Sequence, residues 1–213
     1  PQPAALAEMS LEDLLNIEVT SVSKKPEKLA DAPAAIFVIT REDIRRSGAA
    51  SVPEALRLAP NLEVAKVDAF TWAITARGFN SHNGNKLLVL IDGRTVYSPF
   101  FSGVWWDAQD VVLDDIDRIE VISGPGSALW GSNAVNGVIN ITTRSAKETG
   151  GALVKATAGK GPQGGVARYG FDLPGGGAFR VYAKATSQAS DALQSGAPAM
   201  DEWHSAQGGF RGD

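Results

Sequence analysis

The chain has no cysteine, two histidines and no long apolar run, and each shortage removes a class of site. Without cysteine it forms neither disulfides nor thiolate metal sites. His82 and His204 lie far apart among Asn, Gly and Ser, so a clustered zinc site is not expected. Since no run of about eighteen apolar residues occurs, no transmembrane helix is predicted.

The charge balance also removes a class of partner. The 213 residues include 20 basic and 24 acidic side chains. The resulting net charge of -4 disfavours electrostatic binding to nucleic acid or to anionic lipid. A hydrophobic content of 44% supports a core. The chain begins with neither a methionine nor a charged segment before an apolar run, so any secretory signal is expected to be removed or not included.

Four glycines stand between two strand-like runs in VISGPGSALWGSNAVNGVINITT, residues 121–143. A P-loop would need lysine and then Ser or Thr after Gly131, where Ser132 and Asn133 stand. A dinucleotide fingerprint would need a glycine where Leu129 stands. The glycines are therefore interpreted as backbone positions in a tight passage from strand to turn to strand, with no phosphate bound.

The first 145 residues mix strand and helix signals. A buried-strand run at 34–40 leads into a short helix, with Thr40 and Asp43 as a capping pair and Gly48 as its end. A second short helix begins at the capping residue Ser51 and ends at Ala59-Pro60. Further strands are predicted at 62–67, 71–79, 86–92, 116–123 and 138–143. A hairpin turn at Asp92-Gly93 is expected directly after the strand at 86–92. This half is predicted to be a compact α/β or α+β globule.

Beyond residue 150 the pattern changes to a period of two. In 178–188 one face carries Phe179, Val181, Ala183 and Ala185, and the other carries Arg180, Tyr182, Lys184 and Thr186. The runs 151–159, 166–172 and 204–211 repeat this alternation. A soluble sheet with one wet face is the commoner explanation of the periodicity alone, and a membrane barrel is the alternative. The short LPGGG turn and the long 189–202 connection agree with the barrel.

Several ordered motifs resemble the plug domain of TonB-dependent outer-membrane receptors. They are APAAIFVITREDIRRSGAASVPEALRLAPNLEV (32–64), ITARGFN (74–80), LLVLIDGR (87–94) and IDRIEVISGPGSALWGSNAVNGVINITTR (116–144). The resemblance implies an α+β plug domain, a small mixed sheet with short helices, followed by the first antiparallel strands of a truncated transmembrane β-barrel. The expected domains are an N-terminal segment at 1–30, the plug at 31–145 and about four barrel strands at 146–213.

The same resemblance implies a gated transporter of the bacterial outer membrane, with its plug facing the periplasm. A scarce ligand, such as a ferric siderophore or a similar metal chelate, binds outside, and the periplasmic energy transducer TonB drives import. A ligand-sensing signalling receptor that does not import its ligand is the alternative. No enzymatic activity, cofactor, metal site or nucleic-acid partner is expected. Four strands do not close a barrel of about 22, so the chain is expected to be a fragment.

Site residues are carried over from the resemblance. The TonB-binding segment, whose extended character suits capture by edge-strand addition, is expected at Ile17, Glu18, Val19, Thr20, Ser21, Val22 and Ser23. A frayed terminus is the alternative there. Ligand contacts are expected from the loops 79–85 and 97–106, at Phe79, Asn80, His82, Tyr97, Phe100, Phe101, Trp105 and Trp106. Packing of these rings in the plug core is the competing interpretation. Contacts between plug and barrel are expected from Arg77 and Arg94.

Overall fold

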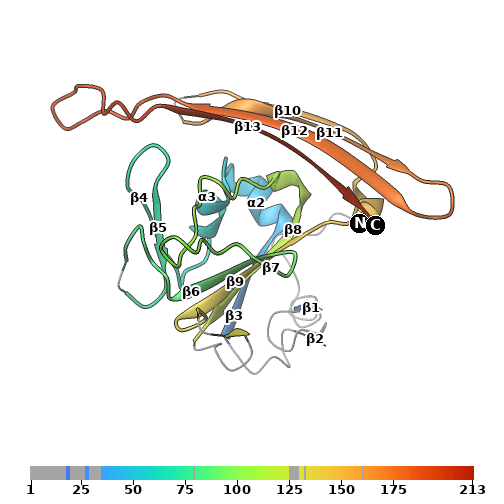
Figure 1. Cartoon of the computed structure of the whole chain (residues 1–213), viewed down its shortest axis with the longest axis horizontal. Coiled ribbons are helices and arrows are strands. Elements are labelled where there is room, and N and C mark those ends of the chain that lie inside the picture. The colour runs from blue at the N-terminus through green and yellow to red at the C-terminus, as the bar shows by residue number, and fades with distance from the viewer. Residues whose placement is uncertain are drawn as a thin grey trace. The chain divides into compact units, whose positions relative to one another are not determined.

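The chain forms two compact units in the computed structural model (Figure 1). The first unit comprises Pro1–Ala65 and Trp72–Thr143, and the second comprises Lys66–Thr71 and Arg144–Asp213. The residues that the structure describes are 18–19, 27–28, 35–78, 80–124, 130–131, 133–159 and 161–213.

A five-stranded mixed sheet forms the centre of the first unit, in the order β3-β8-β9-β6-β7. β9 runs parallel to β6, and the other neighbours are antiparallel. The bounds are β3 (Ala35–Thr40), β6 (Leu87–Ile91), β7 (Arg94–Thr95), β8 (Ile116–Ser123) and β9 (Gly137–Thr143). β8 and β9 are buried along most of their length, as their dense β-branched runs indicate. The predicted mixed sheet is confirmed.

Two short helices pack against this sheet, on one side of it in Figure 1. α2 (Arg41–Ser47) begins with the predicted capping box, in which the Thr40 N–H donates to Asp43 (2.9 Å) and the Asp43 N–H donates to Thr40 Oγ1 (3.2 Å). It ends at Gly48, whose φ is 70°. α3 (Val52–Leu56) is shorter than expected. No helix among the described residues is long and apolar enough to cross a membrane.

The apolar core has a larger and a smaller cluster on the two faces of the sheet. The larger joins the sheet to the helices through residues such as Ile44, Leu56 and Ile139. Leu88 belongs to the smaller cluster, and it alternates along β6 with Leu87 of the larger one. Successive residues of a strand point to opposite faces, so both faces of the sheet are covered by apolar side chains.

The glycines between β8 and β9 serve the backbone, as the sequence predicts. Gly124 and Gly131 have φ values of 113° and 92°, which other residues adopt at a cost. Gly137 lies against the Ile122 carbonyl, where a Cβ atom would have no space. Gly126 lies outside the described residues.

The chain also forms two hairpins, and the 66–71 turn of the second hairpin belongs to the second unit. Between β6 and β7, Asp92 and Gly93 have φ values of 49° and 76°, as the predicted hairpin turn requires. β4 (Glu63–Lys66) pairs with β5 (Trp72–Thr75). The shorter elements are β1 (Glu18–Val19), which pairs with β2 (Glu27–Lys28), and the 3₁₀ turn η3 (Leu113–Asp115).

Glu42 gives α2 a pH dependence that can be tested. Its carboxylate accepts hydrogen bonds from Arg45 Nε (2.8 Å) and Arg46 Nε (2.7 Å), which lower its pKa from 4.5 to about 2. A depressed folded pKa means that the stabilisation is complete above 4.5 and is lost as the pH falls through about 2. We expect protection of the α2 amides from hydrogen exchange, corrected for intrinsic rates, to fall across this window.

Glu42→Gln should have the lower protection already at neutral pH, without this additional loss in acid. Asp107→Asn removes an exposed carboxylate elsewhere and should keep the wild-type profile. Matching profiles for Glu42→Gln and wild type would show that the ion pairs do not stabilise α2.

The second unit contains a four-stranded antiparallel sheet in the order β10-β11-β12-β13. Its register places the predicted apolar positions side by side: Tyr169 opposite Val181, and Val181 opposite Phe210. The bounds are β10 (Gly151–Thr157), β11 (Gln163–Asp172), β12 (Ala178–Gln188) and β13 (Trp203–Gly212), which follow the 3₁₀ turn η4 (Lys147–Thr149). The predicted succession of antiparallel strands is confirmed.

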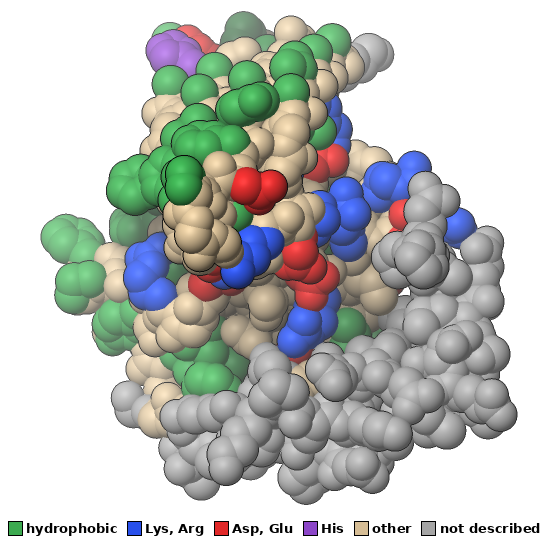
Figure 2. Space-filling model, turned by 90° about the vertical axis from the view of Figure 1, so that its right-hand side faces the viewer, with side chains coloured by type: hydrophobic (Ala, Val, Ile, Leu, Met, Phe, Trp, Pro, Cys, Tyr) green, Lys and Arg blue, Asp and Glu red, His purple; other side chains and the backbone are tan. Residues whose placement is uncertain are grey.

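One face of this sheet is apolar and carries a ladder of rings. Successive ring centroids lie 6.1, 5.8 and 5.6 Å apart along Tyr169, Phe171, Phe179 and Phe210. Hydrophobic side chains gather in the upper part of the view in Figure 2, while acidic and basic side chains lie mixed near its centre. Aromatic rings at one end of an exposed apolar face are typical of a membrane-barrel wall.

Candidate functional site

The expected TonB-binding segment is described at two of its seven positions. Glu18 and Val19 form β1 and pair with Lys28 and Glu27 of β2. The Val19 side chain is fully buried, at 0% exposure. A partner that captures this strand together with its side chains would therefore first have to free Val19. The other positions, Ile17, Thr20, Ser21, Val22 and Ser23, lie outside the described residues.

The two loops expected to contact ligand lie side by side in the first unit. Residues 97–106 form a compact loop, in which the Ser98 N–H donates to the Gly103 carbonyl (2.7 Å). A Cβ atom on Gly103 would stand 2.7 Å from the Gly84 carbonyl oxygen and would also overlap the Phe101 ring. Glycine at this position allows the 81–85 segment to approach the aromatic loop.

The aromatic side chains of this loop divide into exposed and supporting rings. Phe100 is 91% exposed and Trp105 is 47% exposed, and Tyr97 also reaches the surface. Phe101 meets Trp105 edge to face, with ring centroids 4.7 Å apart. Trp106 is 8% exposed and packs in the larger core cluster. The three exposed rings, the aromatic surface of the first unit, lie on a loop that Trp106 attaches to the core.

The neighbouring loop exposes polar side chains. Asn80 and His82 are exposed, and Phe79 lies outside the described residues. Across the described residues, no group of three or more His, Cys, Asp or Glu side chains could hold a metal ion. What the two loops offer is therefore apolar contact together with amide and imidazole hydrogen bonding.

Arg77 and Arg94, expected at the interface between plug and barrel, are both exposed. Arg77 has a φ of 62° and lies beside Gly124, where a Cβ atom would stand 3.8 Å from Arg77 Nη2. Their contact with a barrel wall stays a prediction.

A buried ion pair in β8 was missed in the sequence analysis. Glu120 is fully buried and accepts from Arg118 Nε (2.8 Å), while Arg118 Nη1 donates to Asp117 (2.6 Å). Burial alone would lower the pKa of Arg118, but the hydrogen bonds to Glu120 and Asp117 raise it above its usual value. The signal was available, because residues two apart in a strand share a face.

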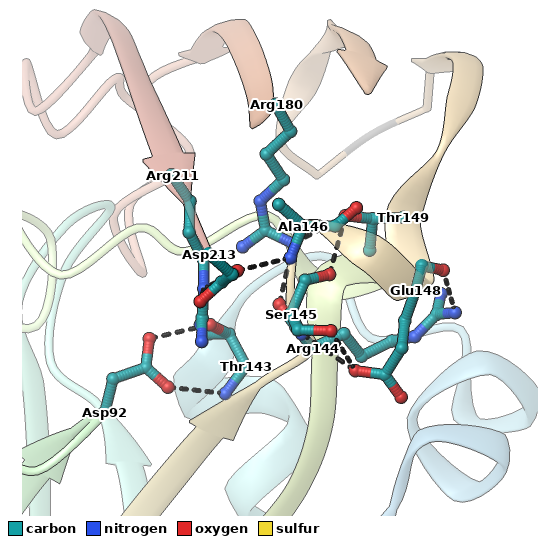
Figure 3. Close-up of polar contacts among 10 residues, drawn as sticks. All are labelled: Asp92, Thr143, Arg144, Ser145, Ala146, Glu148, Thr149, Arg180, Arg211 and Asp213. Carbon is teal, nitrogen blue, oxygen red and sulfur yellow. Dashed lines mark hydrogen bonds and ion pairs between the residues drawn. The ribbon is translucent and has the colours of Figure 1, made fainter. Parts of the chain in front are cut away.

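The end of β9 is fixed to the β6–β7 turn within the first unit (Figure 3). The Asp92 carboxylate accepts from the Thr143 N–H (2.7 Å) and from the Thr143 hydroxyl (2.6 Å). A residue of the hairpin turn therefore also holds the last residue of the central strand.

Within the second unit, the 66–71 turn is bound to residues near the start of β13. Asp201 accepts from the Ala69 N–H (2.9 Å), and Trp203 Nε1 donates to the Ala69 carbonyl (2.9 Å). Lys66 also pairs with Asp191 at 3.3 Å. The pKa of Asp201 is lowered, chiefly by the hydrogen bond from Ala69. No local sequence pattern predicts this contact, because the partners lie more than 100 residues apart.

Comparison with known proteins gives a family match over about half of the chain. Residues 28–138 match the family model described as "TonB-dependent Receptor Plug Domain". The chain is 34% identical to the vitamin B12 transporter BtuB of Vibrio vulnificus over 147 residues, 68% of this chain and 23% of that protein. It is 36% identical to the iron-regulated outer membrane virulence protein of Vibrio cholerae over 135 residues, 59% of this chain and 20% of that protein.

Solved structures share the fold. The ferripyoverdine receptor of the Pseudomonas aeruginosa outer membrane aligns with a TM-score of 0.62 at 18% identity, over 81% of this chain and 23% of that one. The ferric-catecholate import receptor Fiu of E. coli K12 aligns with a TM-score of 0.59 at 21% identity, over 80% and 23%. The chain spans about a quarter of the length of the curated relatives that it matches.

Proposed function

Because this chain belongs to the TonB-dependent receptor plug domain family, we propose that it supplies the plug and first wall strands of an outer-membrane receptor that imports a scarce metal chelate. The observation that carries the proposal is the succession of the two folds. A mixed α+β unit ends at Thr143, and an antiparallel sheet with one exposed apolar face begins at Gly151. The first unit has the fold of a lumen plug, and the second has the alternation of a lipid-facing wall.

In this proposal the ligand arrives from the extracellular side and contacts the aromatic surface of the first unit. Tyr97, Phe100 and Trp105 supply apolar contact, and Asn80 and His82 supply hydrogen bonds. Phe101 packs edge to face against Trp105, and Trp106 attaches the loop to the core. The class of ligand is that of a ferric siderophore or a similar chelate, in keeping with the cargo named for the ferripyoverdine and ferric-catecholate receptors.

Energy for import enters through the N-terminal segment in this proposal. Residues 17–23 face the periplasm, where TonB adds to them as a neighbouring strand and pulls. Strand addition obtains its affinity from main-chain hydrogen bonds, which suits a segment without a distinctive side-chain signature. Since Val19 is buried at rest, ligand binding has to favour the state in which this strand is free.

Substitution in the aromatic loop tests the ligand surface. In the complete receptor that carries this chain, we expect Phe100→Ala and Trp105→Ala each to weaken chelate binding by about tenfold or more, as loss of an exposed aromatic contact residue does. Binding of ferripyoverdine, a ferric catecholate and vitamin B12 to whole cells is the measurement. The fold should persist, because both side chains are exposed.

Leu58→Ala provides a matched control, since it truncates another exposed apolar side chain of the first unit. Its affinity should equal that of wild type. Unchanged affinity in both aromatic variants, for a chelate that the wild type binds, would remove the loop from the ligand site.

A further inference from the structure

The first residues of the second unit's main stretch, Arg144–Gly150, are bound to the face of the β10–β13 sheet that carries Arg180. Arg180, on β12, donates through Nη1 to the Arg144 carbonyl (3.0 Å) and to Thr149 Oγ1 (3.2 Å), as Figure 3 shows. The Arg180 side chain is 6% exposed. A buried guanidinium is stable only while its donors are satisfied, so these bonds are costly to break.

A second attachment comes from the end of β13. Asp213 Oδ2 accepts from the Ala146 N–H at 2.5 Å. Asp213 is itself fixed to β12, because it exchanges main-chain hydrogen bonds with Ala178 (2.9 and 3.0 Å). Arg211 donates to the same carboxylate at 2.8 Å. The acceptor for Ala146 is therefore held in place by two strands of the sheet.

β11 contributes space for the segment at Gly170. Gly170 lies directly beneath it: a Cβ atom there would stand 3.0 Å from the Thr149 carbonyl carbon, 3.1 Å from Gly150 Cα, and closer still to the Thr149 oxygen. All three are main-chain atoms, which a rotamer change does not move. A side chain at position 170 would separate the segment from the sheet.

The segment is also ordered within itself. Thr149 Oγ1 donates to the Ser145 carbonyl (2.9 Å), and the Glu148 carboxylate accepts from the Ser145 N–H (2.9 Å) and hydroxyl (2.7 Å). These bonds from Ser145 lower the pKa of Glu148. Ala146 and Thr149 are both almost fully buried. The segment is therefore a compact turn with fixed attachment points.

We propose that Arg144–Gly150 is an anchor segment, which stays docked on β11, β12 and β13 while the chain before it is remodelled. The proposal rests on the proposed function, in which the N-terminal segment is pulled. Load applied at the N-terminus passes along the chain to Thr143, and next reaches the Arg144 carbonyl, which Arg180 holds. The anchor segment leaves the sheet only when both the Arg180 hydrogen bonds and the Asp213 hydrogen bond are broken. The anchor segment thus limits remodelling to residues before Arg144.

Hydrogen exchange in the complete receptor tests the anchor without any pulling partner. We expect Asp213→Ala to accelerate exchange of the Ala146 amide about tenfold or more, since hydrogen bonds to charged groups are worth at least the 1.4 kcal/mol that a factor of ten represents. Arg180→Met should do the same at Ala146 and Thr149. Gly170→Ala should accelerate both through steric displacement. The β11–β13 ladder should keep its protection, which shows that the variants fold.

Two control variants match these changes. Lys184→Met removes a cation from the same face of β12, and Gly159→Ala adds a Cβ atom in open space. Both should leave Ala146 and Thr149 as protected as in wild type. Unchanged exchange in both Arg180→Met and Asp213→Ala would overturn the anchor.

Pulling the bilayer-embedded receptor with a force probe attached at Glu18 tests the limit directly. The chain from Glu18 to Thr143 extends to at most roughly 45 nm at about 3.6 Å per residue, and the wild type should release no more. The double variant Arg180→Met/Asp213→Ala should release about 2.5 nm more at the same force, the length of the anchor segment. Wild-type release beyond that limit would overturn the proposal, whereas absence of TonB-driven uptake would refute the proposed function and leave this result unaffected.

Discussion

Deletion of residues 17–23 from the complete receptor should reduce chelate uptake to the level of cells without the receptor, while surface binding of the same chelate is unchanged. The two activities use separate parts of the chain in our account. Binding needs the aromatic loop at 97–106, and uptake needs a backbone strand that TonB can capture. Uptake and binding of a radiolabelled ferric chelate, measured on the same cells with and without an energised inner membrane, provide the comparison.

A matched pair of point variants separates backbone capture from side-chain recognition. Thr20→Pro removes a main-chain donor from the segment and should impair uptake severely, whereas Thr20→Ala keeps the donor and should be tolerated. Uptake that persists after the deletion would show that the segment is wrongly placed. Loss of binding together with uptake would show instead that it supports the ligand site.

Local interactions account for most of what the sequence predicted. The capping of α2 involves Thr40, Asp43 and Gly48, which lie within eight residues of one another. The alternation along β12 needs no partner to be recognised, because a strand presents successive side chains to opposite faces. For α2 and β12 the pattern is complete within one element, and the type of both elements was predicted correctly.

One strand is shorter than predicted because of backbone angles that its sequence does not indicate. The strand expected at 71–79 ends at Thr75. Arg77 and Gly78 have φ values of 62° and 82°, which are incompatible with an extended strand. Arginine carries no sequence signal for a left-handed conformation, so this end of the strand could not be predicted.

Contacts between distant residues were the least predictable. Trp105 and Trp106 are neighbours of the same type, yet one is 47% exposed and the other is 8% exposed, because the loop turns between the surface and the core. Arg180 reaches the Arg144 carbonyl across 36 residues, and Trp203 reaches Ala69 across 134. Such pairs follow from the order of strands in the sheets, which the alternation of one strand does not determine.

Removal of residues 18–143 should convert the complete receptor from a closed protein into an open pore. The first unit has its own covered sheet and core. We therefore propose that it fills the barrel lumen and forms none of its wall. A barrel of about 22 strands encloses a lumen that conducts ions freely unless it is plugged. The wall strands from β10 onward remain in the shortened protein, so it should still insert into the bilayer.

Single-channel current across a planar bilayer measures this most directly. We expect no steady conductance from the complete receptor and a large, stable conductance from the protein without residues 18–143. Equal conductance from the two proteins, with both shown to be inserted, would contradict the claim that the first unit closes the barrel.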